Sequence, residues 1–234
     1  MNDCVDPVEN RAFCGHVIDA RVSLGAHPTL TVHGARGSHD RSDFLIVRLV
    51  TDAGVEGHGE VSATLRWSGE DAETAEGVIK RVLAPAIVGQ PLLPVSGVLK
   101  RLDLALAGHP FTKAGLEIAA WDALGRTLGL RVADLLGGPH RTEVPTKLSL
   151  SGDGDDLART LEAARAKGFG SFKVKVGLEP TSDIERFRLA RELAGADTFL
   201  GADANGGWTR LQAHAAIGGL MAQLDKVYPD IECS

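Results

Sequence analysis

The sequence predicts an α/β protein in two parts. Up to Pro139 the pattern is a group of strands followed by a group of helices, and after Pro145 strands and helices alternate regularly. The 234 residues are 44% apolar and 24% charged, which is typical of a soluble globular protein. These observations favour one α+β part followed by one part with a parallel sheet.

The first part is expected to begin with a three-stranded antiparallel sheet. Strand-like runs cover Val17–Leu24, Asp43–Thr51 and Val55–Val61, and Thr51–Gly54 between the last two is a hairpin turn signal.

Two segments of the first part are expected to be loops. Gly25–Arg41 and Ala63–Gly69, which contains Trp67, either cover a binding site and help to select its ligand or are ordinary surface loops.

Helices are expected next. Glu70–Leu83 has helical spacing and Pro85 is expected to end it, and Val95–Ala107 is a second candidate. The third helix is the clearest, because its apolar residues recur at helical spacing and Gly129 follows as a C-cap. Those residues are Leu116, Ala119, Ala120, Ala123, Leu124 and Leu128. A short helix is expected over Val132–Leu136.

The alternation after Pro145 predicts a parallel sheet with right-handed crossovers. The expected strands are Thr146–Leu150, Ser171–Val176, Thr198–Ala202 and Val227–Glu232, and the expected helices are Asp155–Lys167, Thr181–Ala194 and Arg210–Leu224. An eightfold barrel takes about 250 residues, so about 90 residues supply about three βα units and a fourth strand. The barrel is therefore expected to be incomplete.

Polar side chains stand at the ends of two of these strands. Lys173 and Lys175 share one strand face, and Asp203 and Asn205 have the same spacing one βα unit later. If the strands are neighbours, two amines and a carboxylate meet where barrel enzymes carry their active sites. Taken alone, each motif has a commoner explanation. The two lysines would be solvent-exposed residues of an amphipathic strand, and Asp203 and Asn205 would form a turn that caps a helix. Thr209 is the better N-cap, which leaves Asp203 available as a ligand.

Composition and patterning exclude several classes of protein. A net charge of −6 without a basic cluster argues against a nucleic acid partner. No apolar run of about 18 residues predicts a membrane span, and Met1–Asp19 lacks the apolar core of a secretory signal. Three scattered cysteines, Cys4, Cys14 and Cys233, fit a reduced cytoplasmic setting and argue against a cysteine metal site.

Four motifs resemble the mandelate racemase and muconate lactonizing enzymes of the enolase superfamily. In chain order they are Gly57-His58-Gly59-Glu60-Val61, the helix Lys113–Gly125 followed by Leu135-Leu136-Gly137-Gly138, Lys173-Val174-Lys175, and Gly201–Trp208. The Lys-x-Lys pattern resembles the motif of the muconate-lactonizing subgroup.

This resemblance implies an N-terminal α+β capping domain over residues 1–140, followed by an incomplete (β/α)7β TIM-like barrel over residues 141–234. It also implies Mg²⁺ held by three carboxylates on successive strand ends. Asp203 matches the first ligand and Glu232 is the candidate for the second. The third carboxylate and a second lysine, across the substrate from Lys175, have no counterpart in these 234 residues.

The implied chemistry is removal of a proton α to a carboxylate, giving an enediolate, for which enolase-superfamily sites are the standard example. The resemblance assigns Lys175 as the acid and base, with Lys173 tuning it and contacting the substrate carboxylate. A lysine acts as a base only when neutral, and nearby positive charge favours that form. Asn205 and Trp67 are candidate substrate-binding residues.

The leading hypothesis is therefore a Mg²⁺-dependent cycloisomerase, racemase or epimerase, or dehydratase acting on a small carboxylate or amino-acid derivative. The resemblance also implies a homo-oligomer at full length. The alternative is a truncated, catalytically inactive fragment of such an enzyme that acts at most as a binding or interaction module. For these 234 residues alone we expect no turnover.

Overall fold

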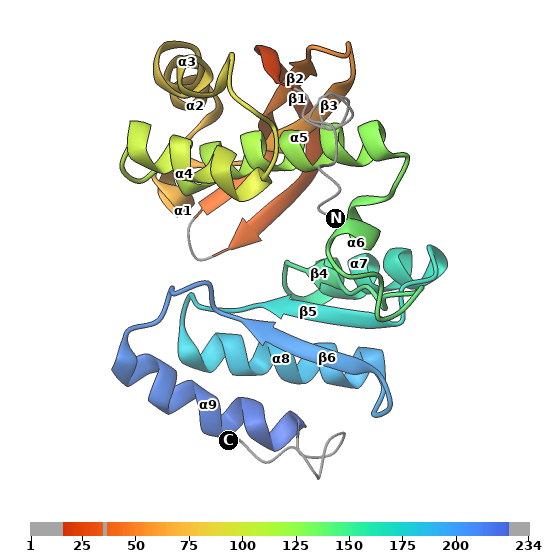
Figure 1. Ribbon diagram of the computed structural model, residues 1–234. Coiled ribbons are helices and arrows are strands. Elements are labelled where there is room, and N and C mark those ends of the chain that lie inside the picture. The colour runs from red at the N-terminus through yellow and green to blue at the C-terminus, as the bar shows by residue number, and fades with distance from the viewer. Residues whose placement is uncertain (1–15, 35–36, 225–234) are drawn as a thin grey trace. The chain divides into compact units, whose positions relative to one another are not determined.

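The computed structural model describes residues 16–34 and 37–224 (Figure 1). The chain forms two compact units that meet in sequence between His140 and Arg141, with Thr29–Asp40 grouped with the second unit. The strand expected over Val227–Glu232 lies outside the described residues.

The first unit contains most of a three-stranded sheet in the order β1-β2-β3. Its strands are β1 (Val17–Gly34), β2 (Gly37–Thr51) and β3 (Glu56–Val61). β2 and β3 pair antiparallel, as expected, with Val47 opposite Gly59. The loop predicted over Gly25–Arg41 is wrong, because β1 runs on to Gly34 and β2 begins at Gly37. The run Thr29–Val32 is rich in β-branched residues, which favour strand.

Helices follow the sheet in the first unit. They are α1 (Leu65–Ser68), α2 (Ala72–Val78), the π-helical turn η2 (Ile79–Leu83), α3 (Ala84–Ile87), α4 (Val95–Ala105), α5 (Pro110–Leu128) and α6 (Val132–Leu135). The expectation that Pro85 ends a helix is wrong, since the helical run continues to Ile87. Pro85 lies in the first turn of α3, where a missing N–H is tolerated, and the wider turn η2 precedes it.

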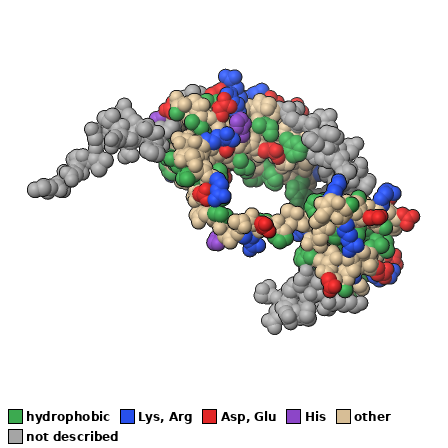
Figure 2. Space-filling view, turned by 90° about the vertical axis from the view of Figure 1, so that its right-hand side faces the viewer, with side chains coloured by type: hydrophobic (Ala, Val, Ile, Leu, Met, Phe, Trp, Pro, Cys, Tyr) green, Lys and Arg blue, Asp and Glu red, His purple; other side chains and the backbone are tan. Residues whose placement is uncertain are grey.

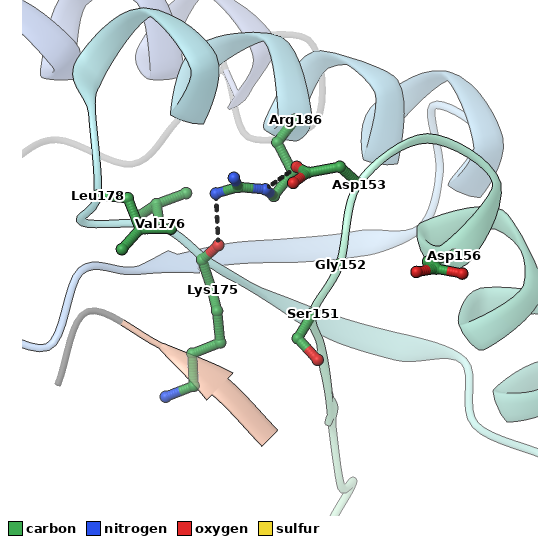
Figure 3. A pocket seen from close by; sticks show the side chains of 8 residues that line it. All are labelled: Ser151, Gly152, Asp153, Asp156, Lys175, Val176, Leu178 and Arg186. Atoms are coloured by element: carbon green, nitrogen blue, oxygen red, sulfur yellow. Dashed lines mark hydrogen bonds and ion pairs between the residues drawn. The ribbon is translucent and has the colours of Figure 1, made fainter. Parts of the chain in front are cut away.

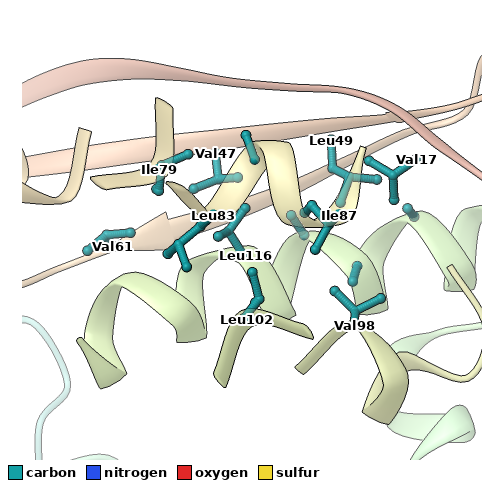
Figure 4. Close-up of a cluster of buried hydrophobic side chains, with 14 of the residues drawn as sticks. Val17, Val47, Leu49, Val61, Ile79, Leu83, Ile87, Val98, Leu102 and Leu116 are labelled. Atoms are coloured by element: carbon teal, nitrogen blue, oxygen red, sulfur yellow. The ribbon is translucent and has the colours of Figure 1, made fainter. Parts of the chain in front are cut away.

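The core of the first unit lies between the sheet and α5 (Figure 4). All residues of the predicted stripe on α5 are buried except Leu128, which packs against the core in part. Two glycines of β3 allow this close approach: a Cβ on Gly57 would lie 2.1 Å from Ala119 O, and one on Gly59 would lie 2.0 Å from Gly115 O. The Gly-x-Gly motif is therefore required by packing.

Glu70 begins no helix, contrary to the sequence prediction. Asp71 caps α2 by accepting a hydrogen bond from Thr74 N. The buried carboxylate of Glu70 instead accepts hydrogen bonds from Phe111 N at 3.0 Å and Thr112 N at 2.9 Å. These amides begin α5 and have no partner within the helix, so Glu70 acts as a cap supplied from 41 residues away.

The second unit is a parallel sheet in the order β4-β5-β6 with helices between its strands. The elements are β4 (Leu148–Leu150), α7 (Gly154–Ala166), β5 (Ser171–Lys175), α8 (Pro180–Ala194), β6 (Phe199–Asp203) and α9 (Arg210–Leu224). This confirms the predicted βα alternation, with ends within two residues of those expected. α8 and α9 pack side by side (Figure 1), and Phe172, Val174 and Phe187 are fully buried in the unit's core.

The charged side chains are mixed on the surface. Figure 2 shows Lys and Arg side chains scattered among Asp and Glu over the described part of this face. In the described ranges, no helix combines the length and apolarity needed to cross a membrane.

Candidate active site

Two lysines and an aspartate converge at the C-terminal ends of β5 and β6. Lys175 and Asp203 are register partners in the parallel ladder, and Lys173 is paired with Gly201. Asp203 Oδ2 accepts hydrogen bonds from Lys173 Nζ at 2.8 Å and from Lys175 Nζ at 2.9 Å. The convergence predicted from the sequence is observed.

The alternation of β5 explains why both lysines lie on this side of the sheet. Val174 is fully buried and Val176, just after the strand, is 2% exposed. The lysine side chains that alternate with these valines keep 25% (Lys173) and 16% (Lys175) of their surface exposed. Both amines are therefore partly shielded from water while remaining accessible to a small molecule.

The electrostatics of the site centre on Asp203. Partial burial raises the pKa of its carboxyl group, but the hydrogen bonds from Lys173 and Lys175 outweigh burial and hold that pKa far below its ordinary value. Asp203 is thus an anion at any physiological pH. With two ammonium groups on one carboxylate, the three side chains carry a net charge of +1, which favours an anionic ligand such as a carboxylate.

Asn205 completes the group. Its side-chain Oδ1 accepts a hydrogen bond from Lys175 Nζ at 2.5 Å, and its backbone N–H donates to Asp203 Oδ1 at 3.0 Å. Asn205 has a positive φ of 47°, a conformation that asparagine tolerates better than most residues. Thr209 Oγ1 accepts from Gln212 N at 3.3 Å, as an N-cap does. Thr209 caps α9, as predicted, and Asp203 does not.

Two further site residues were predicted from the sequence, Trp67 and Glu232. Trp67 is in α1 of the first unit, with 54% of its surface exposed. Glu232 lies outside the described residues.

The described residues do not by themselves fit a magnesium ion. Asp203 and Asn205 offer one carboxylate and one amide oxygen, and two ammonium groups lie on Asp203. Within residues 16–34 and 37–224, no group of three or more His, Cys, Asp or Glu side chains is arranged so that it could hold a metal ion. Since Mg²⁺ takes about six oxygen ligands, a magnesium site here needs further oxygen ligands.

A pocket of about 290 Å³ opens beside Lys175, at the ends of β4 and β5 (Figure 3). Its lining consists of Ser151, Gly152, Asp153, Asp156, Lys175, Val176, Leu178 and Arg186. Arg186 contributes one wall, where its guanidinium donates to Asp153 Oδ1 and to the carbonyl oxygen of Lys175 (Figure 3).

Arg186 and its ion-pair partner Asp183 were not predicted from the sequence. Both are polar residues of α8, and their spacing along the helix did not distinguish them from the others. The one signal in the sequence was Asp183, a carboxylate in the first turn of the helix directly after the Lys-x-Lys strand.

Comparisons with known proteins agree with this fold. The mandelate racemase / muconate lactonizing enzyme N-terminal domain matches residues 18–137, and the enolase C-terminal domain-like family matches residues 156–228. The chain therefore belongs to the mandelate racemase/muconate lactonizing enzyme family of the enolase superfamily.

Among curated relatives, the N-succinyl-L-Arg/Lys racemase of Bacillus cereus is 34% identical over 173 residues, which are 74% of this chain and 47% of the relative. The cis-3-hydroxy-L-proline dehydratase of Roseibium aggregatum is 34% identical over 194 residues, 82% of this chain and 52% of the relative. The chain spans about half the length of these relatives.

Among solved structures, the muconate lactonizing enzyme of Pseudomonas fluorescens in complex with muconolactone superposes with a TM-score of 0.85. It is 26% identical, and the match covers 89% of this chain and 58% of that protein. This likeness confirms the predicted fold class, a strand-containing cap and the parallel sheet of a TIM-like barrel. Similar proteins include a racemase, a dehydratase, an epimerase and a cycloisomerase.

Proposed function

We propose that this protein takes part in Mg²⁺-dependent transfer of a proton at the carbon α to a carboxylate, with Lys175 as the acid and base. The observation that carries the proposal is the convergence of Lys173, Lys175 and Asp203 at one strand end. The racemase, epimerase, dehydratase and cycloisomerase activities in the relatives' names are consistent with one shared first step, after which the intermediate has different fates.

Each of the other site residues has a proposed task. Lys173, held beside Lys175 by the same oxygen, contacts the substrate carboxylate and adds positive charge where the enediolate develops. Asn205 holds Lys175 Nζ in place and is a hydrogen-bonding group for substrate. Trp67 is a proposed substrate contact, as an exposed aromatic side chain. The substrate class is a small carboxylate or an amino-acid derivative.

Among the described residues, Asp203 is the only proposed magnesium ligand. The remaining ligands are carboxylates outside them, for which Glu232 is the sequence candidate. The ion's contribution would be to stabilise the oxyanions of the enediolate.

Exchange of the substrate α-proton for deuterium tests the proposal. The protein is incubated in D₂O with MgCl₂ and a panel of N-acylamino acids, dipeptides and dicarboxylates, and the α-proton signal is followed by NMR. The 234-residue chain and any longer product that the gene encodes are measured in parallel, because the site residues at hand lack a complete ligand set. The proposal expects exchange that stops when EDTA removes the metal. Exchange that persists in EDTA, or no exchange in any product of the gene, would contradict it.

The alternative, an inactive fragment acting as a binding or interaction module, is favoured by the single carboxylate that the described residues bring to the site. It expects the 234-residue chain to fold, to show no exchange with any carboxylate, and to retain binding of one of them in calorimetry.

A further inference from the structure

Asp183, in the first turn of α8, is fully buried and accepts an unusual number of hydrogen bonds. Its Oδ2 accepts from three consecutive backbone amides, Gly177 N at 2.8 Å, Leu178 N at 2.9 Å and Glu179 N at 3.1 Å. The same oxygen accepts from Trp208 Nε1 at 2.9 Å. One carboxylate therefore binds both the loop that follows β5 and the loop that follows β6.

The second oxygen of Asp183 extends these contacts to a third loop. Oδ1 accepts from Arg186 Nη1 at 2.6 Å, and Arg186 is itself 8% exposed. Arg186 also donates to the backbone oxygen of Lys175 at 3.2 Å and to Asp153, which lies just before α7 in the loop after β4. Figure 3 shows the guanidinium between Asp153 and the carbonyl group of Lys175. The pair thus joins three successive βα loops.

The loops after β5 and β6 are also in direct contact. Gly177 has a φ of 105°, and a Cβ on it would lie 2.4 Å from the backbone oxygen of Ala204. Ala204 stands between Asp203 and Asn205, the two groups that hold Lys175 Nζ. Any shift of the β5 loop is therefore transmitted to both partners of Lys175.

We propose that Asp183 is a positioning residue for the site, which sets the position of Lys175 through Arg186 on one side and that of Asp203 and Asn205 through Trp208 on the other. This inference rests on the proposed function, because the position of Lys175 matters for catalysis only if Lys175 transfers the proton. Asp183 does not contact Lys175 Nζ; it acts through backbone amides, an arginine and an indole. Its buried charge is matched to several donors, so removal of the charge loosens all three loops together.

Chemical labelling of lysines tests the inference without any need for turnover. The folded protein is reductively methylated at a fixed pH, and the rate at Lys175 is measured by mass spectrometry relative to the exposed Lys167 of the same protein. Asp183→Asn keeps the size of the side chain and removes its charge. Trp208→Phe is milder, because it removes one hydrogen bond and keeps an aromatic ring. Glu185→Gln, an exposed acid two residues along α8, is the matched control.

The inference expects Lys175 to be labelled about tenfold faster in Asp183→Asn, the effect of losing a charge-assisted hydrogen bond. A smaller increase, roughly threefold, is expected in Trp208→Phe, where one neutral donor is lost, and none in Glu185→Gln. Circular dichroism verifies that each variant is folded. If Asp183→Asn does not fold, Trp208→Phe decides.

A purely structural role would lower the melting temperature and leave the labelling rate of the folded protein unchanged. An unchanged labelling rate at Lys175 would overturn the inference. The deciding variant is Asp183→Asn, or Trp208→Phe if Asp183→Asn does not fold. If the wild-type protein shows no α-proton exchange, the proposed function fails while the labelling result still decides whether Asp183 positions Lys175.

Discussion

Lys175 and Asp203 face each other across the β5–β6 ladder, with Nζ of the lysine 2.9 Å from Oδ2 of the aspartate. They are 28 residues apart in the sequence, and the crossover through α8 brings them together. Lys173 reaches the same oxygen from the next residue on that face. The register of the two parallel strands therefore explains both ion pairs. Substitution of these residues tests what the ion pairs contribute to stability and to proton transfer.

The first prediction concerns stability. Asp203→Asn leaves two ammonium groups beside each other without a carboxylate, so we expect the free energy of unfolding at pH 7 to fall by about 1.5–3 kcal/mol, the range for hydrogen bonds to charged groups. Urea unfolding measures it. Asp197→Asn, an exposed acid in the loop before β6, is the control and should change little.

The same variant predicts a pH dependence. Because the pKa of Asp203 is lower in the folded protein than in the unfolded chain, its ion pairs stabilise the fold above the ordinary carboxyl pKa and lose this contribution as the pH falls towards the folded value. The difference in stability between wild type and Asp203→Asn should therefore be constant from pH 7 to 5 and shrink below about pH 4. A difference that grows on acidification would show that the carboxylate is not the stabilising form.

The second prediction concerns the packing of β3 on α5. In Gly59→Ala the new methyl group would meet the backbone of Gly115, which cannot move without shifting the helix. We expect a loss of about 2–4 kcal/mol, as for a clash in a core. Gly77→Ala, on α2, is the control: its methyl meets only the end of the Arg81 side chain, so the change should stabilise by about 0.5–1 kcal/mol. Equal melting temperatures for the two variants would contradict the packing argument.

Much of the fold and site was predictable because it depends on local patterns. The apolar spacing that ends in Leu128 predicted α5, and alternation in β5 placed Lys173 and Lys175 on one face. Neighbouring parallel strands then required Asp203 and Asn205 to lie close to them. In these cases the positions of side chains follow from the period of one element or from the register of two.

The remaining features depend on contacts between elements, which local patterns do not contain. Glu70 has the spacing of a helical residue, yet its carboxylate caps a distant helix. Asp183 is one acid among several on a polar helix, and only the fold shows that it is buried beneath three loops. The extension of β1 was missed because Gly25–Arg41 was expected to be a loop, although the β-branched residues of Thr29–Val32 favour strand.

The third prediction separates the two lysines. If Lys173 contacts the substrate carboxylate and Lys175 transfers the proton, then Lys173→Ala should raise KM about tenfold, the effect of one lost ionic contact. Its effect on kcat should be smaller than that of Lys175→Ala. Steady-state measurements of α-proton exchange provide both constants. A Lys173→Ala variant that loses kcat as completely as Lys175→Ala would assign proton transfer to the pair rather than to Lys175.

The central claim is that Lys175 moves the proton. Deuterium incorporation at the substrate α-carbon tests it most directly, measured for Lys175→Ala in a product of the gene that catalyses the exchange. General acid and base catalysis contributes roughly 10²–10⁴-fold, so exchange in this variant should fall by that factor. Lys167→Ala, which removes an exposed lysine at the C-terminal end of α7, should retain the wild-type rate. Exchange by Lys175→Ala at the wild-type rate would contradict the claim.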